Sequence, residues 1–170
     1  IDDVTPHDVA VTGQTYKLFE LIGAAPIRGI YVEGNEVNDN KLPQGFLVHQ
    51  PPGSVTQPHF HTANQFQVFV GGSGRFGKKA VDSLAVQYAN GHTPYGPIVA
   101  GDDGVAYFTL RQRWDPGAKY MPRMRDLLER GNQRQRMVIA KDVDGSASTA
   151  RGSEPTNTAL LEAEPDGLGA

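Results

Sequence analysis

Short runs in which apolar and polar residues alternate dominate this sequence, and Gly, Pro and Asn separate one run from the next. Alternation with a period of two places apolar side chains on one face of a β-strand and polar side chains on the other. The predicted strands span residues 16–22, 29–33, 46–49, 65–70, 84–88, 95–99, 105–111 and 137–141. About eight short strands at this spacing are typical of a β-sandwich or a barrel. The sequence therefore predicts an all-β fold.

One segment departs from this pattern and predicts a helix. Three apolar residues lie at helical spacing behind a proline that suits a first helical turn. The residues are Pro122, Met124, Leu127 and Leu128. We expect one short helix near the carboxyl end of the domain, over residues 122–130.

The chain has 170 residues, which is the size of one domain. We expect residues 1–144 to form a single barrel domain with amino-terminal strands. Residues 145–170 contain no aromatic residue and many Ser, Ala, Thr, Gly and Pro, so they are expected to form a low-complexity carboxy-terminal extension. Residues 71–74, Gly-Gly-Ser-Gly, follow a predicted strand and are expected to form a hairpin turn.

The composition excludes several classes of site and partner. The sequence has no Cys, so disulfides, thiolate metal sites and Cys nucleophiles are absent. A formal charge of −3 offers no general attraction to nucleic acid or to anionic lipid. The apolar stretches are far shorter than the ~20 residues of a membrane-spanning helix. We therefore expect a soluble, cytoplasmic protein with a small-molecule substrate, no nucleic-acid or membrane partner, and a homodimeric assembly.

Two histidines stand out because a single residue separates them. In a strand, His59 and His61 project from one side, and Phe60 projects from the other. Gln65 and Gln67, on the next predicted strand, would share one face and turn toward the same pocket. Imidazole and amide groups are ligands for several divalent metals. The segment therefore predicts a metal-chelating pair.

The spacing around this pair resembles the first signature motif of the cupin superfamily. It runs Gly53, five residues, His59, one residue, His61, three residues, Gln65, five residues, Gly71. The cupin motif has a Glu where this chain has Gln65. The resemblance covers roughly residues 40 to 112 and implies a cupin-type double-stranded β-helix, or jelly-roll, barrel with ligands pointing into its interior.

The second cupin motif supplies one more histidine, and His92 is the candidate here. The family places Pro-x-Gly before that histidine, whereas Pro94 and Gly96 follow His92, so this motif is degenerate. The resemblance implies one divalent metal ion held by His59, His61, His92 and Gln65. Whether Gln65 is a ligand or lies beside the ligands stays open.

Neutral ligands leave a divalent ion its full charge, which favours an anionic or enolisable substrate. Cupins with three His and no Glu ligand include iron dioxygenases. The resemblance therefore implies a mononuclear non-haem iron dioxygenase, with Fe favoured and Ni, Mn, Zn or Cu compatible with the same donors. Two alternatives stay open. One is a non-redox metal-dependent isomerase or lyase, and the other is a small-molecule binding or storage protein without catalysis.

Further polar residues are candidates for the pocket. His49 and Tyr107 are candidate proton carriers for catalysis. Gln67, Arg75 and Tyr88 are candidate substrate-pocket residues. For each of them, ordinary packing in a strand or at the surface is the competing interpretation.

Overall fold

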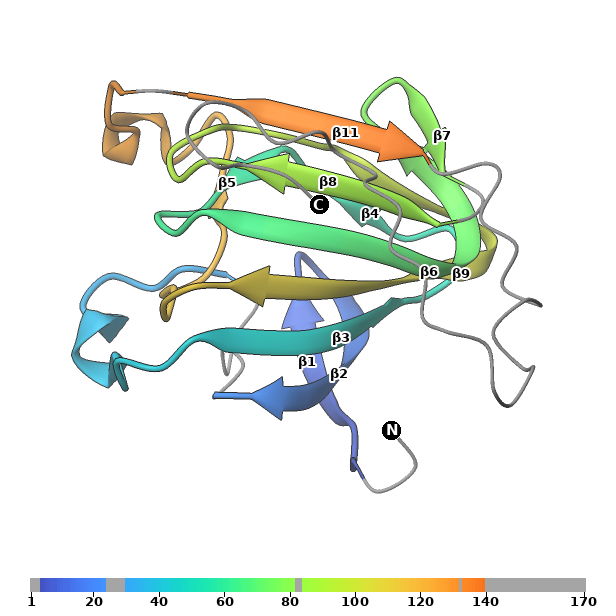
Figure 1. Ribbon diagram of the computed structural model, residues 1–170, viewed down its shortest axis with the longest axis horizontal. Coiled ribbons are helices and arrows are strands. Elements are labelled where there is room, and N and C mark those ends of the chain that lie inside the picture. Colours follow the sequence, from blue (N-terminus) through green and yellow to red (C-terminus); the bar gives the residue numbers. More distant parts are fainter. Residues whose placement is uncertain (1–3, 24–29, 82–83, 132, 140–170) are drawn as a thin grey trace, which may run out of the picture.

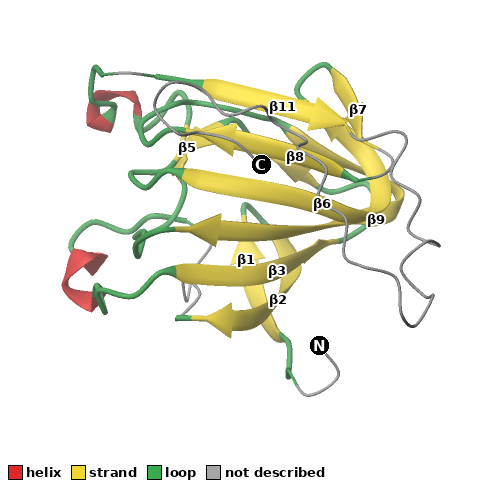
Figure 2. Cartoon of the chain, in the orientation of Figure 1, coloured by secondary structure: helices red, strands yellow, loops and turns green. Residues whose placement is uncertain are grey.

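The structure, a computed structural model, describes residues 4–23, 30–81, 84–131 and 133–139. Within these residues the chain forms strands and two short 3-10 turns (Figure 2). The strands are β1 His7–Val11, β2 Gln14–Ile22, β3 Gln44–Gln50, β4 Val55–Thr56, β5 His59–Phe60, β6 Gln65–Phe76, β7 Lys79–Val81, β8 Ala85–Ala89, β9 Ile98–Arg111, β10 Lys119–Tyr120 and β11 Gln135–Ile139. The turns are η1 Asn35–Asn38 and η2 Arg125–Leu127. The predicted all-β class is confirmed.

Hydrogen bonds join most strands into one large antiparallel sheet (Figure 1). Its order is β1-β2-β3-β9-β6-β8-β11, with β4 added to β9 and β7 added to β6, while β5 pairs with β10. One buried apolar cluster contains Val9 and Val11 from β1 together with Ala85 and Ala89 from β8. Strands from distant positions of the sheet order thus share one core. The sheet therefore curls around an interior, as a barrel does.

The inward-facing side chains of β3, β9, β6 and β8 form three transverse rows. The polar row is Gln44–Arg111–Gln65–Ala89, the middle row is Phe46–Thr109–Gln67–Gln87, and the apolar row is Val48–Tyr107–Phe69–Ala85. Neighbours in a row are directly paired, so alternation along each strand decides which residues point inward. On the other face of the sheet, Phe66 and Val68 pack against Val86 and Tyr88. The interior therefore changes from polar to apolar along the strands.

The glycine run 71–74 is not the predicted hairpin turn. Strand β6 continues through it to Phe76 and stays paired with β9, with register shifts around Gly71 and between Gly72 and Gly74. A Cβ atom on Gly74 would collide with the backbone carbonyl oxygen of Val99. Glycine within a strand marks such a bulge or a close backbone approach. The run therefore lets β6 and β9 bend together.

Replacing Gly74 by alanine is expected to lower the free energy of unfolding by about 1–3 kcal/mol, because the new methyl group meets backbone that must move. Urea denaturation measures this change. Gly131→Ala is the matched control, since a Cβ atom there has no neighbour within 4 Å. Its expected change is within about 0.5 kcal/mol. Equal stabilities of the two variants would contradict the explanation of the glycine run.

The helix predicted over residues 122–130 is present only as the 3-10 turn η2. None of the residues in η2 is buried, and Leu127 is 46% exposed. The residue before the turn, Met124, makes no side-chain capping hydrogen bond. A short helix needs a buried apolar face or a cap, and this segment has neither.

Two predicted strands are shorter than expected. Of the strand predicted over residues 95–99, only the part from Ile98 onward belongs to a strand, β9, and Tyr95 forms an isolated bridge to His59. Over 29–33, the described residues form one bridge, between Ile30 and Ala118.

The predicted extension 145–170 and the end of the predicted strand 137–141 lie outside the described residues. No helix in the part of the chain that the structure describes is long and apolar enough to cross a membrane.

Candidate functional site

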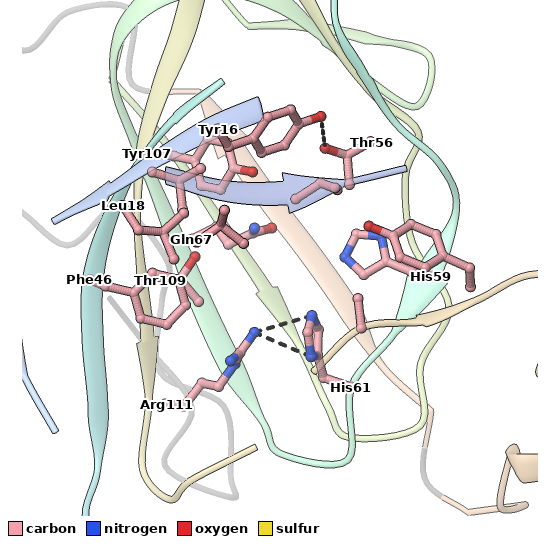
Figure 3. Close-up of a pocket in the computed structure, with 15 residues that line it drawn as sticks. Tyr16, Leu18, Phe46, Thr56, His59, His61, Gln67, Tyr107, Thr109 and Arg111 are labelled. Carbon is pink, nitrogen blue, oxygen red and sulfur yellow. Dashed lines mark hydrogen bonds between the residues drawn. The ribbon is translucent and has the colours of Figure 1, made fainter. Parts of the chain in front are cut away.

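A cavity of about 70 Å³ lies inside the barrel (Figure 3). Its lining comes from the first two strands, the three interior rows and the segments around β5 and β10. The residues are Val9, Val11, Tyr16, Leu18, Phe46, Val48, Thr56, His59, His61, Gln67, Tyr107, Thr109, Arg111, Ala118 and Tyr120. Figure 3 shows Arg111 and His61 facing each other, away from Tyr16 and Tyr107. The cavity therefore has an arginine end and a tyrosine end.

Strand β5 and the residue after it bring two imidazoles to this cavity. His59 is 4% exposed and His61 is 7% exposed. Their ring centroids are 5.2 Å apart, and the rings are nearly perpendicular, at 88°. Phe60, between them, is fully buried and packs near the ring of His92 instead. Backbone hydrogen bonds of 3.0 Å join His59 to Tyr95 in both directions.

Each imidazole is anchored through its Nδ1 atom. His59 Nδ1 lies 2.8 Å from the carbonyl oxygen of Gln57, and His61 Nδ1 lies 2.6 Å from Asp115 Oδ1. A carbonyl or an ionised carboxylate can only accept, so each Nδ1 carries the proton. The Nε2 atom of each ring is then the basic nitrogen.

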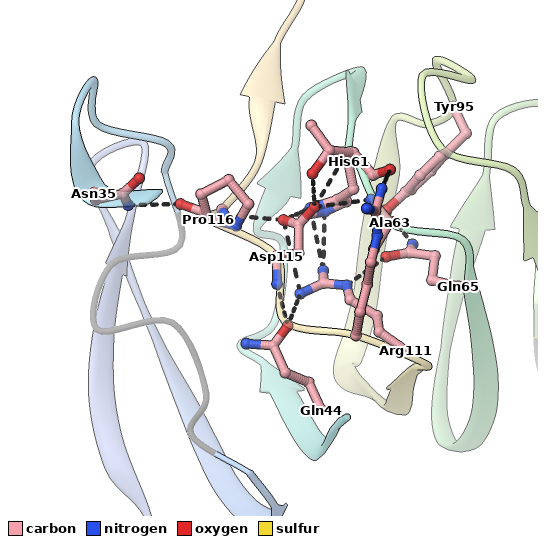
Figure 4. A network of polar contacts seen from close by, with 12 residues as sticks. Asn35, Gln44, His61, Ala63, Gln65, Tyr95, Arg111, Asp115 and Pro116 are labelled. Atoms are coloured by element: carbon pink, nitrogen blue, oxygen red, sulfur yellow. Dashed lines mark hydrogen bonds and ion pairs between the residues drawn. The ribbon is translucent and has the colours of Figure 1, made fainter. Parts of the chain in front are cut away.

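Asp115 links the loop after β9 to the loop after β5 (Figure 4). Besides the contact with His61, its Oδ2 atom accepts hydrogen bonds from the backbone N–H groups of Thr62 at 2.8 Å and Ala63 at 3.1 Å. Burial alone would raise the pKa of Asp115. The neighbouring His61, the positive charge of Arg111 and the N–H donors outweigh burial and hold this pKa well below its usual range. Asp115 is therefore ionised.

Arg111, in the polar row, places its guanidinium against His61. Its Nη2 atom lies 3.1 Å from His61 Nε2 and 3.2 Å from Nδ1. Since Nδ1 is protonated, Nε2 is the acceptor. Arg111 also donates from Nε to Gln65 Oε1 and from Nη1 to Gln44 Oε1, each at 3.1 Å, and Nη1 lies 4.0 Å from Asp115 Oδ1. The guanidinium is thus fixed in the wall of the cavity (Figure 4).

The charge at this end of the cavity comes from Arg111 and Asp115, and not from the imidazoles. Burial, with smaller contributions from His61 and Arg111, lowers the pKa of His59 from 6.5 to about 3. Burial and then Arg111 also lower the pKa of His61, against the opposite influence of Asp115. The contact between His61 and Asp115 is therefore a hydrogen bond from a neutral imidazole to a carboxylate.

Tyrosine hydroxyl groups complete the surroundings of the cavity. Gln65 Nε2 donates to the hydroxyl of Tyr95, and the hydroxyls of Tyr16 and Thr56 lie 2.8 Å apart. Burial raises the pKa of both Tyr95 and Tyr107. These hydroxyls stay protonated at neutral pH and can donate hydrogen bonds.

No protein-family model and no curated protein matches this sequence. Solved structures of oxalate decarboxylase from Bacillus subtilis are similar to it. One has a TM-score of 0.46 and 14% identity, covering 71% of this chain and 30% of that chain. A variant has a TM-score of 0.43 and 16% identity, covering 66% and 28%. Another of these structures, described with Mn(II) centres, has a TM-score of 0.42 and 14% identity and covers 64% and 27%.

This chain thus spans less than a third of the length of those decarboxylase chains. The likeness to these structures is weak. An antiparallel sheet curls around a cavity, and the paired histidines of the first motif line that cavity. The fold is cupin-like.

The polar residues of this cupin-like cavity do not fit a divalent metal ion as they stand. His61 Nε2 accepts from Arg111, and the two amide atoms of Gln65 bond to Arg111 and Tyr95. A guanidinium 3.1 Å from a ligating nitrogen would repel a second cation. Among the residues described, no group of three or more His, Cys, Asp or Glu could hold a metal ion. Protein metal sites commonly use three or four such ligands.

Two of the predicted site histidines lie outside the cupin-like cavity. His92 accepts a hydrogen bond at Nδ1 from the backbone N–H of Glu129, at 3.1 Å, and packs near Phe60, which points away from the histidine pair. The degenerate second motif therefore does not deliver a third imidazole. His49 is exposed and packs against Phe19, with ring centroids 4.9 Å apart, because its strand position places it on the outer face of β3.

Of the other predicted site residues, two line the cavity and two lie outside it. Gln67 and Tyr107 point inward and line the cavity. Tyr88 is buried with Phe66 on the other face of the sheet, and Arg75 is exposed on β6. Strand parity explains Tyr88, which is one residue from the inward-facing position of β8. Arg75 follows the two register shifts of β6, which change the side chains that point inward.

Sequence reasoning missed Arg111 and Asp115. Arg111 ends the predicted strand 105–111 and has the same parity as Tyr107, which is a signal that could have placed it in the interior. Asp115 lies beyond that strand, in the sequence Trp-Asp-Pro-Gly, where no periodicity reports burial.

Proposed function

We propose that this cupin-like chain binds a small carboxylate and catalyses proton transfer on it without a metal ion, as an isomerase or a lyase. The observation that carries the proposal is the guanidinium of Arg111, which is 6% exposed and held against His61 in the wall of the cavity. Arg111 would supply the positive charge that the resemblance assigned to a metal. The hydrogen bonds to Gln44 and Gln65 hold that charge in place.

The size of the cavity limits the ligand. Each water-sized group needs at least about 10–15 Å³ of cavity volume, so roughly five non-hydrogen atoms fit. The cavity volume is about 70 Å³. A carboxylate of two or three carbons matches both this size and the charge of Arg111, because guanidinium groups bind carboxylates through charge-assisted hydrogen bonds.

The imidazoles supply the acid–base chemistry. Asp115 holds the proton of His61 on Nδ1, so Nε2 is the atom that accepts a proton. When a carboxylate takes over the N–H group of Arg111, Nε2 is released to remove a proton from the carbon beside the carboxylate. The C–H electron pair moves onto the carboxylate oxygens, and the donors of Arg111 stabilise the added charge. The hydroxyl of Tyr107, which stays protonated at neutral pH, can return a proton.

A second candidate is the metal-dependent enzyme that the sequence favoured, including the iron dioxygenase. It is supported by the anchoring of both Nδ1 atoms to acceptors, which is the usual arrangement behind metal-bound histidines. This candidate requires Arg111 to leave His61 and a further ligand to join the pair. The carboxylate proposal also breaks the hydrogen bond between Arg111 and His61, but it requires no further protein ligand.

Elemental analysis of protein purified without added metal separates the two candidates. The carboxylate proposal expects far less than one metal ion per chain, together with acetate binding that weakens about 10- to 100-fold in Arg111→Met, the effect of losing a charge-assisted hydrogen bond. Arg125→Met, on the exposed turn η2, is the matched control and should bind as the wild type does. One tightly bound metal ion per chain, or unchanged acetate binding in Arg111→Met, would contradict the proposal.

Proton transfer has its own test. In D2O, the wild-type protein is expected to speed deuterium exchange at the carbon beside the carboxylate of small 2-oxo and 2-hydroxy acids, measured by NMR. His61→Gln should slow that exchange by about 10²–10⁴-fold, because it removes the proton acceptor. His49→Gln, with its side chain on the outer face, is the control. Exchange that survives in His61→Gln would exclude His61 as the base.

A further inference from the structure

Two glutamine side chains face each other across β6 and β8 inside the barrel. Gln67 and Gln87 are directly paired in the middle row, and they are 4% and 0% exposed. Gln67 Oε1 and both amide atoms of Gln87 have no hydrogen-bond partner in the described structure. Buried amide groups are almost always hydrogen bonded. Gln67 lines the cavity, and its amide oxygen has no partner within the described part of the wall.

The chemistry of this acceptor complements that of Arg111. An amide oxygen only accepts, so a carboxylate cannot satisfy it, whereas a hydroxyl group can. Thr109, which pairs with Gln67 in register, adds a hydroxyl to the same row. The middle row therefore offers hydrogen-bonding groups for a neutral O–H group, next to a polar row that offers positive charge.

The spacing of the two rows sets the length of the ligand. Successive inward-facing residues of a strand, such as Thr109 and Arg111, lie about 7 Å apart. A ligand that reaches both rows is therefore short, and a carboxylate and a hydroxyl on neighbouring carbon atoms meet this requirement. The cavity volume of about 70 Å³ agrees with so short a molecule.

We propose that Gln67 forms a hydroxyl-recognition site, and that the ligand class of the cavity is the small 2-hydroxy carboxylates. The inference rests on the proposed function, because it takes Arg111 as the carboxylate-binding group. Gln67 Oε1 accepts the hydroxyl proton of the ligand. Gln87 lies behind it as a positioning residue, on the strand that pairs with β6.

Glycolate and acetate are the probes, because they differ by the hydroxyl group alone. Titration followed by calorimetry or NMR is expected to give glycolate at least tenfold tighter binding than acetate in the wild-type protein. Gln67→Met keeps the shape of the side chain and removes the acceptor, so it should bring glycolate binding to the level of acetate. Gln133→Met, at an exposed loop position, is the matched control and should keep the preference.

The outcomes separate this inference from the proposed function. Equal binding of glycolate and acetate by the wild type, or a preference that persists in Gln67→Met, overturns the hydroxyl site and leaves the role of Arg111 intact. Binding of neither acid overturns both. A crystal structure of the wild-type protein with glycolate gives an answer even if Gln67→Met does not fold. The hydroxyl within hydrogen-bond distance of Gln67 Oε1 supports the site, and any other placement refutes it.

Discussion

Replacing Asp115 by alanine is expected to lower the free energy of unfolding by about 3–5 kcal/mol, the cost of breaking a buried charge pair by removing one partner. The carboxylate is fully buried, and it accepts hydrogen bonds from His61 and from the backbone N–H groups of Thr62 and Ala63. Its loss would leave these donors unpaired and the charge of Arg111 uncompensated. Urea denaturation followed by circular dichroism measures the change.

Asp102→Ala provides the matched comparison, because Asp102 is exposed in β9. Its expected effect is within about 0.5 kcal/mol. Asp115→Asn should fall between the two, since it keeps one acceptor oxygen and loses the charge. A loss below about 1 kcal/mol in Asp115→Ala would show that Asp115 does not hold the two loops together.

Stability is expected to fall as the pH drops below neutrality, because His59 is buried as a neutral imidazole. Its pKa is about 3 in the folded protein against a usual value of 6.5. Between these two values the unfolded chain binds a proton that the folded chain does not bind, so acid favours unfolding. From about pH 7.5 to pH 4.5 this group alone should remove about 2.5 kcal/mol. The lowered pKa of His61 acts in the same direction.

Urea denaturation at a series of pH values, for the wild type and for His59→Gln, tests this expectation. The variant lacks the titrating group, so its stability should depend less steeply on pH. The slope of the free energy of unfolding against pH should be smaller by up to the amount that one bound proton contributes. His49→Gln, altered at an exposed position, should keep the wild-type slope. Identical slopes in the wild type and in His59→Gln would mean that His59 is not buried as a neutral group.

The sequence predicted those parts of the molecule that depend on strand periodicity. Gln65 and Gln67 share the inward face of β6, and Phe66 packs on the outer face, as the alternation implied. The His59 and His61 rings come together for the same reason. Alternation reports on face and burial directly, because every second side chain of a strand lies on the same side.

Loops and turns carry no comparable signal, and the predictions of the helix and of His92 as a ligand fail there. Those for His49 and Tyr88 fail because these residues lie on the outer face of their strands. The position of His92 depends on the course of the loop before β9, and motif spacing alone placed it in the site. The contact of Asp115 with His61 joins residues 54 positions apart in the sequence. The glycine run in β6 is explained by an approach to Val99, which only the folded structure contains. In each case a tertiary contact decides the local structure.

The first two strands lie outside the stretch that resembles cupins, yet Val9, Val11, Tyr16 and Leu18 all belong to the wall of the cavity. Tyr16 also reaches across to Thr56 through a hydroxyl contact of 2.8 Å. A shortened protein that begins after Ile22 would keep both motif histidines and lose one side of the chamber. Solvent would then reach the imidazoles, and the desolvation that keeps them uncharged would vanish. The amino-terminal hairpin is therefore part of what keeps the histidine pair uncharged, although it contributes none of the reacting atoms.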